Sequence, residues 1–223
     1  MSYRFDCADI SGRRRGLTRA KDVLAEGELV VVPTEASYGL ACDAFSATGV
    51  VALRAAKGNR RLVPPVLIGS GRTLDGLASD VRQNARDLAE AFWPGPLTLI
   101  CHAQVTLDWG LGGAVGGAVG GTVSLRVPLH PVLLELLAET GPLAVTGANV
   151  PGHPVPTTYD EAVEQLGELP AVYLDAGPTR YGGVSTVVDA RGLVPRVVRS
   201  GALAVEALRE VVPELLDLEE AGA

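Results

Sequence analysis

The sequence contains little of what a disulfide-linked, metal-binding or secreted protein needs. Only three of its 223 residues are cysteines and three are histidines. Cys7, Cys42 and Cys101 lie far apart and form no Cys-x-x-Cys or Cys/His pattern. We therefore expect neither a disulfide framework nor a metal site. Arg13–Arg15 lie near the N-terminus but no apolar run follows them, so this segment does not read as a signal peptide.

Long apolar runs that stay free of proline and glycine are also lacking. Residues 91–107 carry no charge but contain two prolines, and residues 140–159 contain four prolines and three glycines. A membrane-spanning helix rarely holds so many helix-breaking residues. We therefore predict no contact with a membrane and a cytoplasmic protein.

Lysine is the scarcest charged residue, with Lys21 and Lys57 as its two occurrences among 19 basic side chains. The 26 acidic residues outnumber the basic ones and give a net charge of −7. This balance argues against a protein that coats nucleic acid by bulk charge, although a local basic groove remains open. Hydrophobic residues make up 47% of the chain, which is enough for a sizeable folded core.

Hydrophobic periodicity predicts strands and helices that alternate along the chain. We expect strands at 29–33, 65–68, 97–101, 122–127, 143–145, 171–174, 186–189 and 196–199, and helices at 18–26, 47–56, 80–92, 131–138 and 158–166. Thr18 and Ser79 are the expected N-caps of the first and third helices. Because no linker divides this alternation, the sequence predicts one α/β domain.

The two ends of the chain differ in charge from its centre. Residues 1–15 form a basic N-terminal segment, and residues 202–223 are interpreted as an acidic C-terminal helix. Gly110–Gly121 repeats the tetrapeptide GGAV, and its glycines do not follow the GxGxxG spacing of a dinucleotide loop. We interpret it as a flexible loop, with a phosphate-cradling role as the alternative.

Cations, hydroxyls and glycines gather where the predicted strands and helices end. Such groups are what phosphate and carboxylate ligands require, and α/β sheets place ligand sites at strand ends. No pair of carboxylates stands out as an acid/base couple. From the residues alone we predict a site for an anionic ligand and no more. The groups in question lie in Pro33–Leu40, Lys57–Arg61, Thr146–Asn149 and Ser185–Thr186, and at Arg126 and Arg199.

Several strings in the chain resemble the YrdC-like family, whose best-known members are threonylcarbamoyl-AMP synthases of the TsaC type. Val32–Leu40 resembles the family pattern V-P-T-E-T-x-Y-G-L, and Lys57–Pro64 resembles K-x-R-P-x-x-x-P. The order and spacing of the matches make the resemblance specific over about residues 16–201, which we take as the YrdC-like domain. Further matches are Phe92–Thr98, Leu125–Pro128, Ala148–Asn149, Ser185–Asp189 and Val198–Gly201.

The resemblance implies a twisted mixed β-sheet with flanking helices around a positively lined cavity. It also implies a reaction in which L-threonine, bicarbonate and ATP give threonylcarbamoyl-adenylate and pyrophosphate, for the modification of adenosine in tRNA. ATP would bind with Mg²⁺, and bicarbonate would be a substrate. Lys57, Arg60 and Asn149 would have catalytic roles. Substrate and nucleotide would bind to Thr34, Tyr38, Arg126, Thr146, Gly147, Ser185 and Arg199.

The chain departs from the family pattern at positions expected to face substrate. The family combines Lys, Arg, Ser and Asn, whereas here Asn59 stands at the Arg position and Gly147 at the Ser position. Arg60 lies next to Asn59 and is our candidate for the displaced Arg role. Two further positions that differ from the family are Ala36 and Pro151.

Three functions therefore stay open at this point. The first is a threonylcarbamoyl-AMP synthase, and the second is a paralogue that uses another amino acid or carbamoyl-adenylate in specialised metabolism. The third is a non-catalytic member that binds nucleotide or RNA. We expect small-molecule partners, with weak RNA contact left open. Lys57 and Arg60 also fit a simpler interpretation as solvated cations near a helix end.

Overall fold

The computed structural model describes residues 1–107, 111, 121–179 and 183–218. Its strands are β1 (Tyr3–Asp6), β2 (Val30–Pro33), β3 (Tyr38–Asp43), β4 (Val66–Leu67), β5 (Ala78–Ser79), β6 (Leu97–Ala103), β7 (Thr122–Arg126), β8 (Leu143–Gly147), β9 (Val172–Asp175), β10 (Thr186–Asp189) and β11 (Arg196–Arg199). Its helices are α1 (Ile10–Ala25), α2 (Ala47–Ala56), η1 (Gly71–Thr73, 3-10), α3 (Leu74–Leu77), α4 (Gln83–Phe92), α5 (Pro131–Thr140), α6 (Tyr159–Leu166) and α7 (Val205–Val211).

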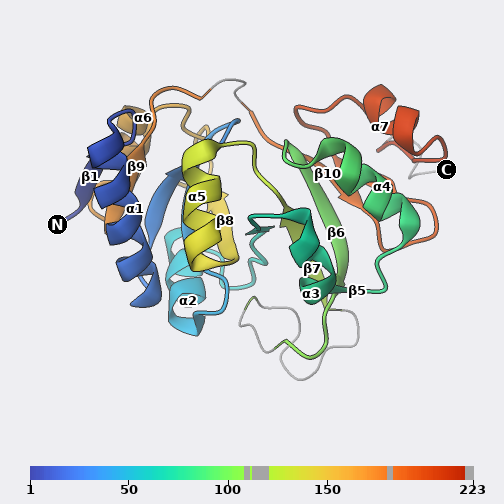
Figure 1. Cartoon of the computed structure of the whole chain (residues 1–223), viewed down its shortest axis with the longest axis horizontal. Helices are drawn as coiled ribbons and strands as arrows, with labels where there is room; N and C mark the ends of the chain where they lie inside the picture. The colour runs from blue at the N-terminus through green and yellow to red at the C-terminus, as the bar shows by residue number, and fades with distance from the viewer. Residues whose placement is uncertain (108–110, 112–120, 180–182, 219–223) are drawn as a thin grey trace.

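One mixed sheet joins all of these strands. Its order is β1-β9-β2-β3-β8-β4-β7-β6-β10-β11, with β5 paired to β6. The sheet contains parallel pairs, such as β2 with β9, and antiparallel pairs, such as β3 with β8. The sheet therefore runs the length of the molecule, from β1 and α1 at one end to α4 and α7 at the other (Figure 1).

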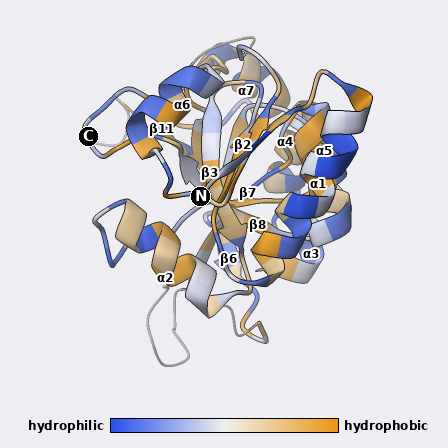
Figure 2. Ribbon diagram, turned by 90° about the vertical axis from the view of Figure 1, so that its left-hand side faces the viewer, coloured by the Kyte–Doolittle hydropathy of each residue, from blue (hydrophilic) through white to orange (hydrophobic). Residues whose placement is uncertain are grey.

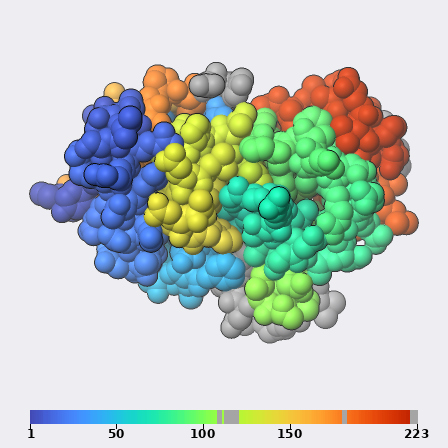
Figure 3. All heavy atoms as spheres, viewed as in Figure 1, coloured from blue at the N-terminus to red at the C-terminus, as the bar shows by residue number. Residues whose placement is uncertain are grey.

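The helices cover both faces of this sheet, with α1, α3 and α5 on one side and α2 and α6 on the other (Figure 2). The alternation of side chains along β2 explains the two layers, because neighbouring residues of a strand point to opposite faces. Val30 and Val32 belong to the core under α1 and α5, whereas Val31 belongs to the core under α2. On the outer surface, α5 lies against α1 along its length (Figure 3).

The structure confirms the α/β class and the mixed sheet but corrects the start of two helices. The first helix begins at Ile10, because the side chain of Asp9 caps it by accepting a hydrogen bond from Gly12 N at 2.6 Å. Thr18 therefore lies inside the helix. The third predicted helix begins at Gln83, since Ser79 is paired in β5 with His102 and Asp80 has a φ of 49°.

Within the described residues, the structure corrects both predicted terminal segments. Residues 3–6 form β1, which pairs in parallel with β9, and the limit predicted at residue 15 falls inside α1. The predicted C-terminal helix is shorter in the described part of the chain, where it spans Val205–Val211. The limits of the predicted domain stay a prediction. The Gly110–Gly121 repeat lies outside the described residues except for Leu111 and Gly121. Within the described part of the chain, no helix is long and apolar enough to cross a membrane.

Candidate active site

A cavity of about 440 Å³ opens across the middle of the sheet. The residues that line it come from the β2–β3 turn, the end of α2, the end of β8 and the segment before β10. Neighbouring strands β3, β8, β4, β7 and β6 bring these segments together although they are far apart in sequence. All of the predicted site residues except Arg60 line this cavity: Thr34, Tyr38, Lys57, Arg126, Thr146, Gly147, Asn149, Ser185 and Arg199. Their roles remain predictions.

Lys57 is held by the turn that follows β8. It caps the C-terminal end of α2, and its Nζ donates to Gly147 O at 3.1 Å, to Asn149 O at 2.5 Å and to Asn149 Oδ1 at 3.0 Å. The carboxamide of Asn149 is fixed in turn, because its Nδ2 donates to Val150 O and His153 O. Burial lowers the pKa of Lys57 below its ordinary value. The ammonium thus sits half-buried among neutral oxygen atoms.

The β2–β3 turn forms another wall of the cavity. Thr34 Oγ1 donates to Ser37 O at 2.7 Å and accepts from the backbone N–H groups of Ala36 and Ser37, so the hydroxyl closes the turn. Tyr38 is fully buried, and its hydroxyl donates to Gly177 O at 2.6 Å. Burial raises the pKa of Tyr38 above its ordinary value. Both hydroxyls are therefore engaged in holding the backbone.

Two arginines approach the cavity from its other side. Arg126 ends β7, is buried, and donates from Nε to Gly95 O at 3.0 Å and from Nη2 to Glu35 Oε1. Arg199 ends β11 and donates from Nη2 to the carbonyl oxygen and the hydroxyl of Ser185 at 2.8 and 2.9 Å. Partial burial, and then the charge of Arg126, lower the pKa of Arg199.

The geometry therefore gathers Lys57, Arg126 and Arg199 around one cavity whose described lining contains no carboxylate. A polyanion such as a nucleotide phosphate chain matches this charge. Across the described residues, no three His, Cys, Asp or Glu side chains lie close enough to hold a metal ion.

Comparison with known proteins identifies the family of the chain. The model of the Sua5/YciO/YrdC family, which carries the description telomere recombination, matches residues 22–201. The chain belongs to this family. It is 47% identical, over 95% of its length and 96% of the relative, to a Mycobacterium tuberculosis protein named provisionally as a threonylcarbamoyl-AMP synthase. It is 34% identical to the threonylcarbamoyl-AMP synthase of Pyrococcus abyssi, covering 88% of this chain and 57% of that relative.

Solved structures of the Sua5/YciO/YrdC family show the same arrangement of the chain. Sua5 of Pyrococcus abyssi in complex with L-threonine aligns with a TM-score of 0.84 and 30% identity, over 97% of this chain and 62% of that one. YciO of Escherichia coli aligns with a TM-score of 0.78 at 21% identity, over 93% of this chain and 100% of that one, which supports the fold alone.

The residues that differ from the family pattern lie in the wall of the cavity. Asn59 lines the cavity and is exposed, while Arg60 beside it is exposed and is not among the lining residues. A Cβ atom on Gly147 would lie 2.6 Å from Asn149 Oδ1, so the present position of the Asn149 carboxamide requires glycine there. Ala36 and Pro151 also line the cavity.

Two residues of the site, Thr98 and Glu35, were not among those predicted from the sequence. Thr98 lines the cavity and its hydroxyl lies 2.8 Å from that of Ser185. Glu35 pairs with Arg126 from behind the cavity wall. Each lies inside a string that matches the family, and an acidic residue inside the otherwise uncharged Val32–Leu40 string was the signal for Glu35.

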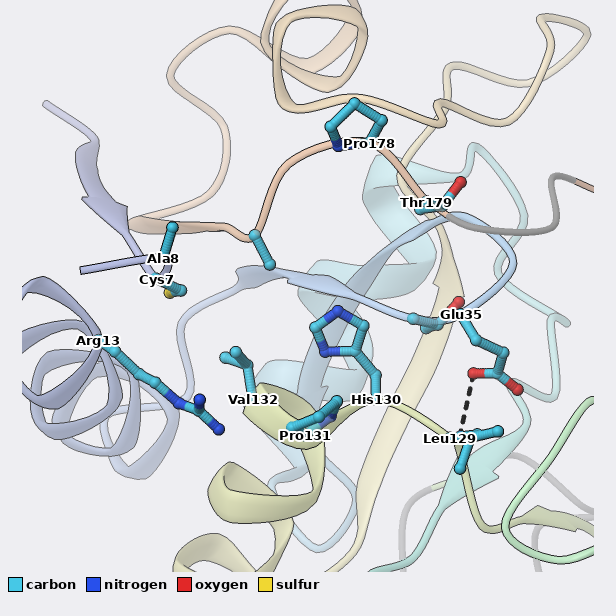
Figure 4. A pocket seen from close by; sticks show the side chains of 12 residues that line it. Cys7, Ala8, Arg13, Glu35, Leu129, His130, Pro131, Val132, Pro178 and Thr179 are labelled. Atoms are coloured by element: carbon cyan, nitrogen blue, oxygen red, sulfur yellow. Dashed lines mark hydrogen bonds between the residues drawn. The ribbon is translucent and has the colours of Figure 1, made fainter. Parts of the chain in front are cut away.

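A second cavity, of about 390 Å³, lies on the other side of the β2–β3 turn. Figure 4 shows its lining, with Arg13 on one side, His130 in the centre, and Glu35 pointing its carboxylate at the backbone of Leu129. Thr34 lines both cavities, so the turn is the partition between them.

Proposed function

We propose that the protein is a threonylcarbamoyl-AMP synthase. The amine of L-threonine attacks bicarbonate to give a carbamate and water; a carbamate oxygen then attacks the α-phosphorus of ATP, and pyrophosphate leaves. The product is threonylcarbamoyl-adenylate, the intermediate for a modification of adenosine in tRNA. The observation that carries the proposal is the cavity lined by three cations and, among its described residues, no carboxylate.

The reaction needs positioning and charge neutralisation more than side-chain acid/base chemistry, which suits these residues. We assign Lys57 and Asn149 to the reacting carbamate and phosphate groups, and Arg126 and Arg199 to the remaining phosphates or the threonine carboxylate. The other proposed ligand groups are Thr34, Tyr38, Thr146, Gly147 and Ser185. We do not assign the role of the family arginine to Arg60, because it lies outside the cavity lining. Magnesium would enter with ATP, held mainly by phosphate oxygens and water. We also propose a cytoplasmic location.

The proposal is tested by incubating the purified protein with ATP, Mg²⁺, bicarbonate and L-threonine. We expect pyrophosphate and threonylcarbamoyl-adenylate in equal amounts, with neither formed when bicarbonate or threonine is left out. Pyrophosphate release that threonine does not stimulate would refute the proposal.

A second candidate is a synthase for another amino acid. It is favoured by Asn59 and Gly147, because both line the cavity and both differ from the family pattern. The same assay with each of the other amino acids distinguishes the two, since a re-specialised cavity would turn over a different amine faster than threonine. A non-catalytic member would bind ATP or tRNA in the same solutions without forming pyrophosphate.

A further inference from the structure

We propose that Glu35 is a positioning residue: it holds the guanidinium of Arg126 in the orientation in which Arg126 binds an anionic group of the substrate. The identity of that anion rests on the proposed function, whereas the positioning does not. Glu35 does not line the cavity itself, so it acts through Arg126 and not on the reacting atoms.

The contacts of Glu35 leave its carboxylate fully engaged. Its side chain is 2% exposed, Oε1 accepts from Arg126 Nη2, and Oε2 accepts from Leu129 N at 3.1 Å. A buried carboxylate with both oxygens bound in this way is fixed in place and has no oxygen directed at a substrate. Glu35 therefore ties the β2–β3 turn to the segment between β7 and α5.

The orientation of Arg126 follows from these bonds. Its Nη2 is bound by Glu35 and its Nε by Gly95 O, so one side of the planar group is occupied by fixed acceptors. Among the described residues, no hydrogen bond is made by Nη1, and Arg126 lines the cavity. A rigid guanidinium held at two nitrogens presents its remaining donors in a defined direction, as recognition of phosphate or carboxylate requires.

The charge of Glu35 also reduces the repulsion between Arg126 and Arg199. Arg126 and Arg199 line the same cavity, and the charge of Arg126 disfavours the charged form of Arg199. Glu35 offsets one of these positive charges from behind the wall. Without it, the two guanidinium groups would repel each other before any anion binds, and Arg126 would turn toward solvent.

The test compares Glu35→Gln, Arg126→Gln and the double variant Glu35→Gln/Arg126→Gln with the wild type. Glutamine at position 35 keeps the size of the side chain but removes its charge. In the double variant, the two amides can hydrogen-bond to each other and restore the fold. Asp75→Asn is the matched control, because it removes a carboxylate paired with Arg86 on an exposed surface away from the cavity.

We expect Glu35→Gln to weaken ATP affinity and to lower kcat/KM by about 10- to 100-fold, by analogy with the loss of residues that orient metal ligands. The double variant should regain the wild-type Tm but not the affinity or the turnover. A double variant that regains all three would overturn the proposal, because Glu35 would then be structural only. So would a folded Glu35→Gln protein with wild-type ATP affinity.

A readout that needs no activity separates this inference from the proposed function. The Nε–H of Arg126, bound to Gly95 O, should give a slowly exchanging NMR signal in the wild type and a fast one in Glu35→Gln. If the wild type shows no threonine-dependent turnover but this change occurs, the proposed function fails and the inference stands. If turnover is present and exchange is unchanged, the inference fails alone.

Discussion

Lys57 and Arg126 are both cations at the wall of one cavity, yet the protein holds them in opposite ways. Arg126 is paired with a buried carboxylate, whereas Lys57 is surrounded by the carbonyl and carboxamide oxygens of residues 147–149. The charge of Arg126 is therefore offset within the protein, and that of Lys57 is solvated by dipoles but not neutralised. An anion in the cavity gains most from the cation that has no counter-charge.

Because of this difference, Arg126 and Lys57 contribute to the stability of the fold in different ways. The pair formed by Glu35 and Arg126 costs desolvation on both sides, so it adds little net stability while it is intact. Lys57 uses its three donor positions to hold a turn, and an incoming phosphate must replace at least one of these acceptors. Arg126 is thus ready to bind, whereas Lys57 must exchange partners on binding.

The largest effect is expected from Lys57→Ala. Loss of this cation, which has no internal counter-charge, should lower kcat/KM for ATP by about 100-fold, in the range found when one charge-stabilising donor is removed. Lys57→Gln is the matched control, because it retains hydrogen bonds to the 147–149 turn without the charge. Steady-state kinetics and the Tm of both variants test this. A Lys57→Gln protein with wild-type kinetics would show that Lys57 only holds the turn.

A smaller kinetic effect, an increase of about tenfold in KM, is expected from Gly147→Ala. The new Cβ would lie 2.6 Å from Asn149 Oδ1, so the carboxamide must rotate and Lys57 loses an acceptor. Overpacking of this kind costs about 1–3 kcal/mol of folding free energy. Denaturant unfolding and the KM for each substrate measure the two consequences.

Gly76→Ala is the control for that substitution, since a Cβ there meets nothing within 4 Å. It should leave both stability and kinetics near the wild type. An equal loss in the two variants would mean that the close approach at position 147 is not what matters.

The polar residues of the site were predictable because each is next to a hydrophobic run whose period was clear. Lys57 follows the helix at 47–56, which the structure reproduces with the same limits, and Arg126 lies near the end of the strand predicted at 122–127. The family resemblance supplied the remaining positions through strings of matching residues. Both kinds of signal are local, so they fix where a residue stands along the chain.

What local signals do not carry is the partner that a residue finds across the fold. Glu35 and Arg126 are 91 residues apart, and nothing in either string indicates that one binds the other. Strand β3 is also absent from the predicted strands, because Tyr38–Asp43 directly follows the polar turn after β2. Its pairing with β2 and β8 is what makes it a strand. The first helix was predicted to begin at Thr18 and not at Ile10, because Arg13–Arg15 interrupt the apolar pattern of its first turns, whose buried residues are Gly12, Gly16 and Leu17.

An alkaline pH should lower ATP affinity by a few-fold. The pKa of Lys57 is lowered by burial, so its proton is lost at a lower pH than from an ordinary lysine. ATP affinity should therefore begin to fall at an alkaline pH below 10.5, which is the ordinary pKa of lysine. Over the same pH range the free energy of unfolding rises, because the unfolded chain still binds the proton. Lys57→Arg should remove this alkaline decline. An identical decline in both proteins would assign it to another group.

The smallest effect is expected where the sequence predicted a large one, at Arg60. The side chain is exposed and is not among the residues that line the cavity, whereas Asn59 is. A solvent-exposed cation outside the cavity acts on the bound anion through screened charge, so Arg60→Ala should change kcat/KM by about twofold or less. Arg61→Ala is the matched control, since that residue is exposed at the next position. A loss near that of Lys57→Ala, seen at Arg60 and not at Arg61, would instead give Arg60 the role of the family arginine and require the loop to close over the ligand.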